Sequence, residues 1–433
     1  MTLRGLELLS LRLRLQTPPA MTKLFAALPL VLSVFAAPAA TEVTKQVIAA
    51  PATIASNLPT IFLDAKEPIV SDRKVACSVR MILPPATVGS SVSATGVVRI
   101  HGGISQGFPK KSYGLTLNPS VQWLGMRDSG HWVLNAAFVD RSLMRHKLSY
   151  DLFRSLNVAG GKHFSSASRF VEVHLNGQYN GAYLLMERVD RALLDLQRFD
   201  SNAPSHACIY KAVDHAANFS QPGHAGYEQR EPDVETKPYW GPLDEFNRFV
   251  SGTPDPEFND PQKGIASRLD IDNAIDFHLL VLLTFNSDGI TKNFMIARNS
   301  VVTNAPAPLF FFVPWDYDGT FGRNWDASRV DATAWLSNHL FDRLHGDAAF
   351  RKKFAARWTQ LRVREFSVAT MHRMIDENAH ILGGAASRNA ERWRTLDGPY
   401  PDRLTFEEDV IQMKEWVEAR VKWLDEEIER RSR

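Results

Sequence analysis

The sequence predicts an α+β fold in two lobes, a small β-rich lobe at residues 61–190 and a larger, mainly helical lobe at residues 191–433. The first lobe is predicted from strand-like segments, at 75–83, 96–100 and 112–117. The second lobe is predicted from helical patterns that dominate after residue 244, interrupted by one β-hairpin around 294–313. The assignment depends on periodicity, because alternation favours strands whereas apolar spacing of three or four favours helices.

One amphipathic helix is expected in the first lobe, at residues 141–156. Met144, Leu148, Leu152 and Leu156 recur at a spacing of four, which places them on one side of a helix. Asp140 precedes the segment and is a residue type that favours the N-cap position. We therefore expect this helix to pack its apolar side on the sheet.

A β-hairpin is the clearest local feature after this helix. Residues 170–175 alternate, Asn176 and Gly177 supply a turn that tolerates positive φ, and residues 179–187 return. Residues 200–241 are polar and rich in Pro and Gly, so they are expected to form a long excursion. The last helix is expected at 406–433, with a buried stripe of Val410, Met413, Trp416, Val417, Val421 and Leu424.

The composition is that of a globular protein. Of the 433 residues 44% are hydrophobic and 23% are charged, and the formal net charge is only +2. This balance gives no broad positive field for nucleic acid, so no nucleic-acid partner is expected. Cys77 and Cys208 are too few for a disulfide scaffold or a four-cysteine zinc site, and either one bridge or two buried thiols fits the sequence.

The N-terminal region has the pattern of a secretory signal peptide, which predicts a secreted or extracytoplasmic protein. Lys23 precedes an apolar run at 24–35, and small residues follow at 36–40. Met21 is the expected start of this signal, with residues 1–20 as an upstream extension and 41–60 as a flexible lead-in. An ordinary apolar helix is the alternative. We expect no transmembrane helix in the mature chain, because no later segment is apolar over the required length.

Candidate catalytic residues follow the apolar segment 279–285. Asp288 is followed five positions later by Asn293, which is the catalytic-loop spacing of protein kinases. A predicted strand at 309–313 then leads to Asp316 and Asp318. Carboxylate and amide oxygens are the ligands that Mg²⁺ prefers, and phosphoryl transfer requires such a cation. The alternative is that these Asp and Asn residues only form turns.

Four segments, in order, resemble the spore-coat protein H (CotH) kinase family of secreted, atypical protein kinases. They are residues 108–113 (FPKKSY), 140–153 (DRSLMRHKLSYDLF), 175–190 (LNGQYNGAYLLMERVD) and 314–322 (PWDYDGTFG). Together they extend the resemblance over roughly residues 60 to 425. The resemblance implies an atypical protein-kinase-like fold for the two lobes.

The resemblance also implies roles for the acidic residues. Asp288 matches the family's catalytic Asp, which would position the acceptor hydroxyl and take its proton. Asp316 matches the metal-binding Asp, and Asn293 and Asp318 are candidate further ligands of Mg²⁺ or Mn²⁺. The implied cosubstrate is ATP.

Two further segments are implied to bind the nucleotide. Lys110 or Lys111 would neutralise the phosphates, although a solvated basic turn is the alternative. Met186, Glu187 and Arg188 fall where a kinase chain meets the adenine, and Glu187 could instead be a structural ion-pair partner.

The chain departs from ordinary kinases in two places, and a third segment differs from the family. No His-Arg pair precedes Asp288, and the predicted helix carries Arg145, His146 and Lys147 where a pairing Glu is expected. Residues 99–105 are similar to the family's Gly- and Ser-containing loop over the phosphates, but His101 begins the Gly-Gly pair in place of the more usual Arg.

The expected activity is transfer of the γ-phosphoryl group of ATP to Ser or Thr of secreted or surface proteins, such as spore-coat-like proteins. Two alternatives remain open from the sequence. One is a non-catalytic surface or adhesion module, and the other is a nucleotidyl transferase that transfers AMP.

Overall fold

A computed structural model describes most of the chain after residue 55. The described residues are 56–84, 91–156, 163–198, 200, 205–235, 237–302, 304–326, 328–393 and 404–433. The expected signal peptide at 21–40 and most of the lead-in lie outside them. Within the described ranges, no helix has the length and apolarity needed to cross a membrane.

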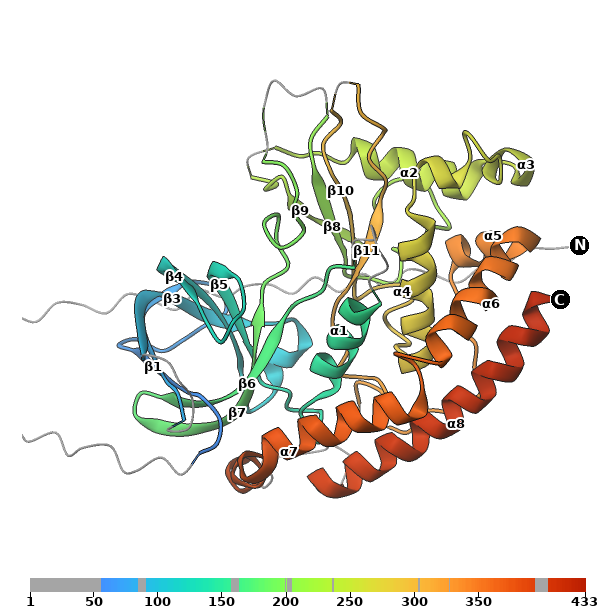
Figure 1. Cartoon of the computed structure of the whole chain (residues 1–433). Coiled ribbons are helices and arrows are strands. Elements are labelled where there is room, and N and C mark those ends of the chain that lie inside the picture. The colour runs from blue at the N-terminus through green and yellow to red at the C-terminus, as the bar shows by residue number, and fades with distance from the viewer. Residues whose placement is uncertain are drawn as a thin grey trace, which may run out of the picture. The chain divides into compact units, whose positions relative to one another are not determined.

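The N-terminal part forms a closed barrel of seven strands (Figure 1). The strand order is β1-β2-β3-β4-β5-β7-β6. The strands are β1 (Thr60–Ala65), β2 (Val75–Ile82), β3 (Val92–His101), β4 (Ser112–Gln122), β5 (Asp128–Asn135), β6 (Ser168–Leu175) and β7 (Gln178–Glu187). Parallel pairing of β1 with β6, from Thr60 opposite Glu172 to Leu63 opposite Leu175, closes the barrel. Closure satisfies the backbone groups that an open sheet leaves at its edges.

Alternation along the strands fills the barrel interior. In β2, Val75, Cys77, Val79 and Met81 are buried while the residues between them are exposed. The β6–β7 hairpin forms as predicted, because Asn176 (φ 49°) and Gly177 (φ 79°) both adopt the left-handed conformation that its turn requires.

A second sheet of four strands follows, in the order β11-β10-β8-β9 (Figure 1). Its strands are β8 (Cys208–Ala212), β9 (Tyr227–Glu231), β10 (Phe294–Arg298) and β11 (Phe311–Pro314), and all neighbours are antiparallel. The first two strands lie inside the polar stretch that was expected to be an excursion. β9 reads Tyr-Glu-Gln-Arg-Glu, so its composition gives little sign of a strand.

Eight α-helices accompany the two sheets in the described residues. They are α1 (Arg145–Ser155), α2 (Gly241–Gly252), α3 (Asp255–Phe258), α4 (Ile271–Thr284), α5 (His339–Gly346), α6 (Ala348–Arg362), α7 (Val368–Trp393) and α8 (Phe406–Ser432). Every residue of α4 from Asn273 to Thr284 is buried, including the polar Asn273, Asp276 and His278. α7 and α8 run side by side (Figure 1), and Thr405 and Glu408 form a capping box at the start of α8.

The predicted layout, a small sheet lobe with one helix and a mainly helical second lobe as in protein kinases, is wrong. The N-terminal strands close into a barrel through the parallel β1–β6 pairing, and the C-terminal half contains a four-stranded sheet besides its helices. Element order could not predict this result, because barrel closure depends on pairing between strands about a hundred residues apart.

Both cysteines are free and buried. Cys77 lies in the barrel core on β2, whereas Cys208 lies on β8 of the second sheet. Burial raises the pKa of each thiol to about 11. Of the two alternatives left open by the sequence, the structure therefore has two buried thiols.

Two packed histidines predict loss of stability in acid. The His278 ring lies 4.1 Å from that of Phe341, and the His345 ring lies 4.8 Å from that of Phe354. Burial lowers the pKa of His345 to about 4 and also lowers that of His278. The unfolded chain binds more protons between pH 6.5 and 4, so acidification favours unfolding there.

His345 should cost about 2 kcal/mol of unfolding free energy between pH 7.5 and 4.5, and His278 should add to this loss. Urea titrations at the two pH values measure this loss. His345→Phe should reduce the loss, whereas His224→Phe, at an exposed histidine stacked on Trp240, should leave it unchanged. An equal loss in the wild type and His345→Phe would contradict the account.

Candidate active site

The loop after α4 carries Asp288. The helix ends at Phe285, whose left-handed backbone (φ 55°) turns the chain away from the helix axis. The Asp288 carbonyl accepts hydrogen bonds from the backbone N–H groups of Thr291 (3.1 Å) and Lys292 (2.8 Å), which closes the loop. The Asp288 carboxylate lies 3.1 Å from Lys292 Nζ and 3.7 Å from His215 Nε2, and 23% of the side chain is exposed. It is therefore accessible to an incoming side chain.

Asn293 and Asp316 lie at the same end of the β10–β11 hairpin. Both have left-handed backbones, with φ of 57° and 59°. The Trp315 N–H donates to the Asn293 carbonyl over 3.2 Å, just beyond the pairing of Phe294 with Pro314. The two strands thus bring residues far apart in the sequence to one edge of the second sheet.

Asn286 joins the Asp288 loop to Asp316. Its buried side chain donates from Nδ2 to the Asp316 carbonyl (3.2 Å) and accepts from the Gly289 N–H through Oδ1 (2.9 Å). The structure therefore brings together three predicted residues, Asp288, Asn293 and Asp316. Asn286 was not predicted from the sequence. Its position two residues before Asp288 is the only sequence feature that could have indicated a role in the site.

His146 of α1 contacts the Asp316 carboxylate. Its Nε2 lies 3.3 Å from Asp316 Oδ1, and the Asp316 N–H donates to Tyr150 Oη over 3.0 Å. Burial opposes ionisation of Asp316, but the hydrogen bond to His146 and the positive charges of Lys211 and His101 hold the pKa of Asp316 below its ordinary value. His146 stands in the helix segment where the sequence analysis looked for a Glu.

The pKa of Asp318 is shifted in the opposite direction to that of Asp316. Burial, and after it the charge of Asp316, raises the pKa of Asp318 to about 7. Two nearby carboxylates of this kind are stabilised in their ionised form by a divalent cation. Their oxygens, with the Asn293 amide, are the ligand types of Mg²⁺ and Mn²⁺. In the described part of the chain, no group of three or more His, Cys, Asp and Glu side chains is arranged to hold a metal ion.

A buried ion-pair cluster fixes the segment after Asp318. Arg145 Nη1 lies 2.5 Å from Asp140 Oδ1 and 2.6 Å from Asp409 Oδ2, and its Nε donates to the Thr320 carbonyl over 2.8 Å. Asp140 was expected to cap the helix, but α1 begins only at Arg145, and Asp140 accepts the Arg145 N–H instead. This cluster connects α1, α8 and the loop that contains Asp318.

Lys110 and Lys111 differ in their surroundings. Lys110 is 1% exposed, and its Nζ donates to the carbonyls of Ala136 (2.7 Å) and Ala182 and to Asn389 Oδ1 (2.8 Å). Burial lowers the pKa of Lys110 well below its ordinary value. Lys111 Nζ donates to the Gln106 carbonyl over 2.7 Å. The three donors of the Lys110 ammonium group thus already have acceptors within the protein.

The segment 186–188 leaves the barrel at the end of β7. Met186 is buried within the strand pairing, opposite Val133. Glu187 is buried and accepts from the backbone N–H of Arg127 (2.9 Å), and the Arg127 guanidinium lies 3.9 Å away. Arg188 is exposed. Glu187 therefore has the contacts of the structural partner that the sequence left as an alternative, whereas Arg188 is accessible to a ligand.

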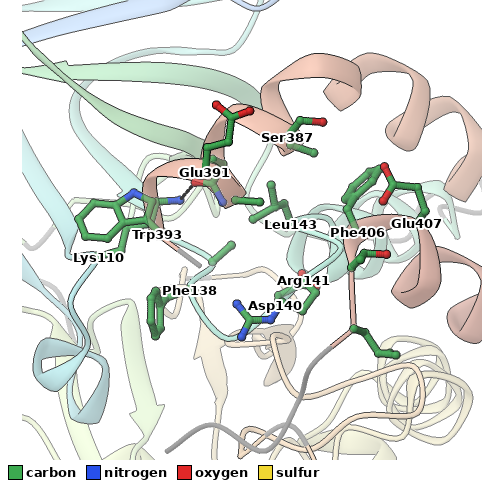
Figure 2. A pocket seen from close by; sticks show the side chains of 16 residues that line it. Lys110, Phe138, Asp140, Arg141, Leu143, Ser387, Glu391, Trp393, Phe406 and Glu407 are labelled. Atoms are coloured by element: carbon green, nitrogen blue, oxygen red, sulfur yellow. Dashed lines mark hydrogen bonds between the residues drawn. The ribbon is translucent and has the colours of Figure 1, made fainter. Parts of the chain in front are cut away.

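A cavity of about 640 Å³ lies elsewhere (Figure 2). Lys110 is the only predicted site residue among its lining residues. Phe138, Leu143 and Phe406 supply apolar walls, and Trp393 also lines it. This cavity does not include Asp288 or Asp316, so we do not assign the catalytic site to it.

The site combines Asp288, in the loop after α4, with Asn293, Asp316 and Asp318 at the end of the β10–β11 hairpin. Such an acidic site is of the class suited to binding a divalent cation and phosphate. The chain belongs to the CotH kinase protein family, whose sequence model matches residues 98–424. The predicted family resemblance is confirmed. The chain is also 29% identical over 260 residues to inner spore coat protein H of Bacillus subtilis (strain 168). That match covers 57% of this chain and 65% of the relative, so it spans slightly less than two thirds of that protein.

Proposed function

We propose that this chain is an ATP-dependent protein kinase that transfers the γ-phosphoryl group to Ser or Thr hydroxyls. The observation that carries the proposal is the side chain of Asn286, which joins the Asp288 loop to Asp316. Phosphoryl transfer needs a group that positions the acceptor hydroxyl beside a cation that neutralises the phosphates. Membership in the CotH kinase protein family supports the same assignment.

The residues would divide the reaction between them. Asp288 would accept the hydrogen bond of the acceptor hydroxyl and then its proton, because its carboxylate is accessible from solvent. Asp316, Asp318 and Asn293 would hold Mg²⁺ or Mn²⁺, which neutralises phosphate charge when bound. His146 would orient the Asp316 carboxylate through the 3.3 Å contact. Catalysis would come from positioning and charge neutralisation.

The proposed substrates are secreted or surface proteins. The relative's name places that protein in the inner spore coat, and residues 21–40 have the pattern of a secretory signal. We propose that the mature chain acts outside the cytoplasm on spore-coat-like proteins. Its net charge of +2 gives no reason to expect a nucleic-acid partner.

Labelled ATP tests the proposal and separates its alternatives. The protein is incubated with Mn²⁺ and an acceptor such as casein, with ATP labelled at either the α or the γ position. The expected result is γ-label on Ser or Thr of the acceptor and no α-label. Label from the α position would instead indicate AMP transfer, and a protein that binds ATP but transfers neither label would be a binding module. Asp288→Asn serves as the control for label that is not transferred enzymatically.

A further inference from the structure

The proposed nucleotide site needs a cation that can reach the phosphates. Lys110 does not meet this need, because its buried Nζ already donates to two carbonyls and to Asn389. Releasing it would remove a donor from the two carbonyls and from Asn389, of which Asn389 Oδ1 would keep only the Ala182 N–H, and loss of a donor to a buried carbonyl is unfavourable. A different positive group should therefore contact the phosphates.

Lys211 of β8 lies beside the cation ligands. The carbonyl of the next residue, Ala212, accepts the Asn293 N–H over 3.1 Å, so the backbone of Lys211 is fixed next to Asn293. Its Nζ lies 5.4 Å from the centroid of the Trp315 ring, and Trp315 directly precedes Asp316. The strand pairing and the ring contact together hold this lysine at the edge where Asp316 lies.

In the described residues, the ammonium group of Lys211 forms no ion pair with a carboxylate. Across the part of the chain that the structure describes, its Nζ has no hydrogen-bond acceptor and no carboxylate within ion-pair distance, and the side chain is half-buried. Lys292 differs in this respect, since it is paired with Asp288 at 3.1 Å. A lysine held in a protein without an anionic partner has three donors to offer to a ligand.

Other basic side chains lie near the same place. His101, at the end of β3, has its ring 6.5 Å from that of Trp315. Burial, and after it the positive charges of Lys211, Arg188 and Arg99, lowers the pKa of His101 to about 4, so the His101 ring is neutral near pH 7. In the described residues, the guanidinium groups of Arg188 and Arg99 have no hydrogen-bond or ion-pair partner. The positive charges of Lys211, Arg188 and Arg99 would repel one another, and the carboxylate of Asp316 compensates only part of their charge.

We propose that Lys211, together with Arg188, binds the phosphate groups of the nucleoside triphosphate at the Asp316 site. This inference rests on the proposed function and assigns the phosphate contact to β8 and the end of β7 in place of Lys110. A polyanion would neutralise a cluster of cations that the protein itself leaves unpaired. The contact is to phosphate, so adenosine should not depend on it.

Calorimetric titration of the full-length protein tests the inference with three ligands: ATP with Mn²⁺, inorganic triphosphate with Mn²⁺, and adenosine. Lys211→Met should weaken ATP and triphosphate binding by about 10- to 100-fold, as expected for loss of a charge-assisted hydrogen bond. Adenosine binding should be unchanged. Lys211→Arg should restore most of the affinity for ATP.

Lys237→Met is the matched control, because Lys237 Nζ also lies over an aromatic ring, that of Tyr239 at 5.7 Å, but beside His206. It should bind ATP as the wild type does. Arg188→Met provides a second variant at an exposed position, which tests the cluster even if Lys211→Met does not fold. Thermal melting checks that each variant is folded.

The outcomes separate this inference from the proposed function. If the wild type binds no ATP, the proposed kinase activity fails. If the wild type binds ATP and both Lys211→Met and Arg188→Met bind it equally well, only the phosphate assignment is wrong. Equal weakening of ATP and adenosine would also contradict it, because the loss would then not be specific to phosphate.

Discussion

Asp316→Asn is expected to reduce transfer of γ-label by about 10³-fold or more, because the amide removes the charge that holds the cation and its phosphates. The substitution preserves the size of the side chain, so the fold should persist. The measurement is the initial rate of γ-label incorporation at saturating Mn²⁺ and ATP, with the melting temperature as the check on folding.

Asp342→Asn is the matched control for this variant. Asp342 is an exposed acid on α5, and its substitution should leave the rate within about twofold of the wild type, as expected for a surface position. Asp288→Asn should lose activity as Asp316→Asn does, but it should still bind ATP with Mn²⁺. Retention of more than a tenth of the wild-type rate in folded Asp316→Asn would exclude the assigned role.

Arg145→Met is expected to lower the free energy of unfolding by about 3–5 kcal/mol, because it removes the shared ion-pair partner of two buried carboxylates. Asp140 and Asp409 each form an ion pair with this guanidinium, and all three side chains are 1% exposed. Burial opposes the charge of Arg145, yet its two acidic partners raise its pKa. Urea unfolding at pH 7 measures the change.

Arg373→Met is the control for the ion-pair cluster. Arg373 pairs with Glu377 one helical turn away on α7, and both side chains are more than half exposed. Removal of this pair should change the unfolding free energy by about 0.5 kcal/mol or less. A similarly small change in Arg145→Met would show that the buried cluster does not stabilise the loop after Asp318.

Local features of the fold could be predicted from the sequence, but the way the strands assemble could not. The Asn176-Gly177 turn and the final helix both form, and Met413, Trp416, Val417, Val421 and Leu424 of the predicted stripe are buried, although Val410 is only half-buried. These features depend on neighbours within a few residues. The parallel β1–β6 pairing and the join of β8 to β10 depend on segments far apart, and periodicity carries no information about such partners.

The candidate site likewise contains residues that the sequence could predict and residues that it could not. Spacing within one loop and one hairpin predicted Asp288, Asn293 and Asp316, and the structure places these segments together. His146 and Lys211 were not identified, because α1 and β8 reach Asp316 only through the tertiary fold. Lys110 was predicted as a phosphate contact because it lies in a basic segment. The sequence could not show that its ammonium group donates to two carbonyl groups.

The central claim is that Asp316, Asp318 and Asn293 hold one divalent cation together with ATP. Electron paramagnetic resonance of free Mn²⁺, titrated with protein in the presence of ATP, tests it most directly. At concentrations where ATP alone leaves most Mn²⁺ free, the account predicts that the protein binds one further Mn²⁺ per chain together with ATP, and that this binding is lost in Asp316→Asn and retained in Asp288→Asn. Mn²⁺ binding that is absent from the wild type, or equally strong in folded Asp316→Asn, would contradict the claim.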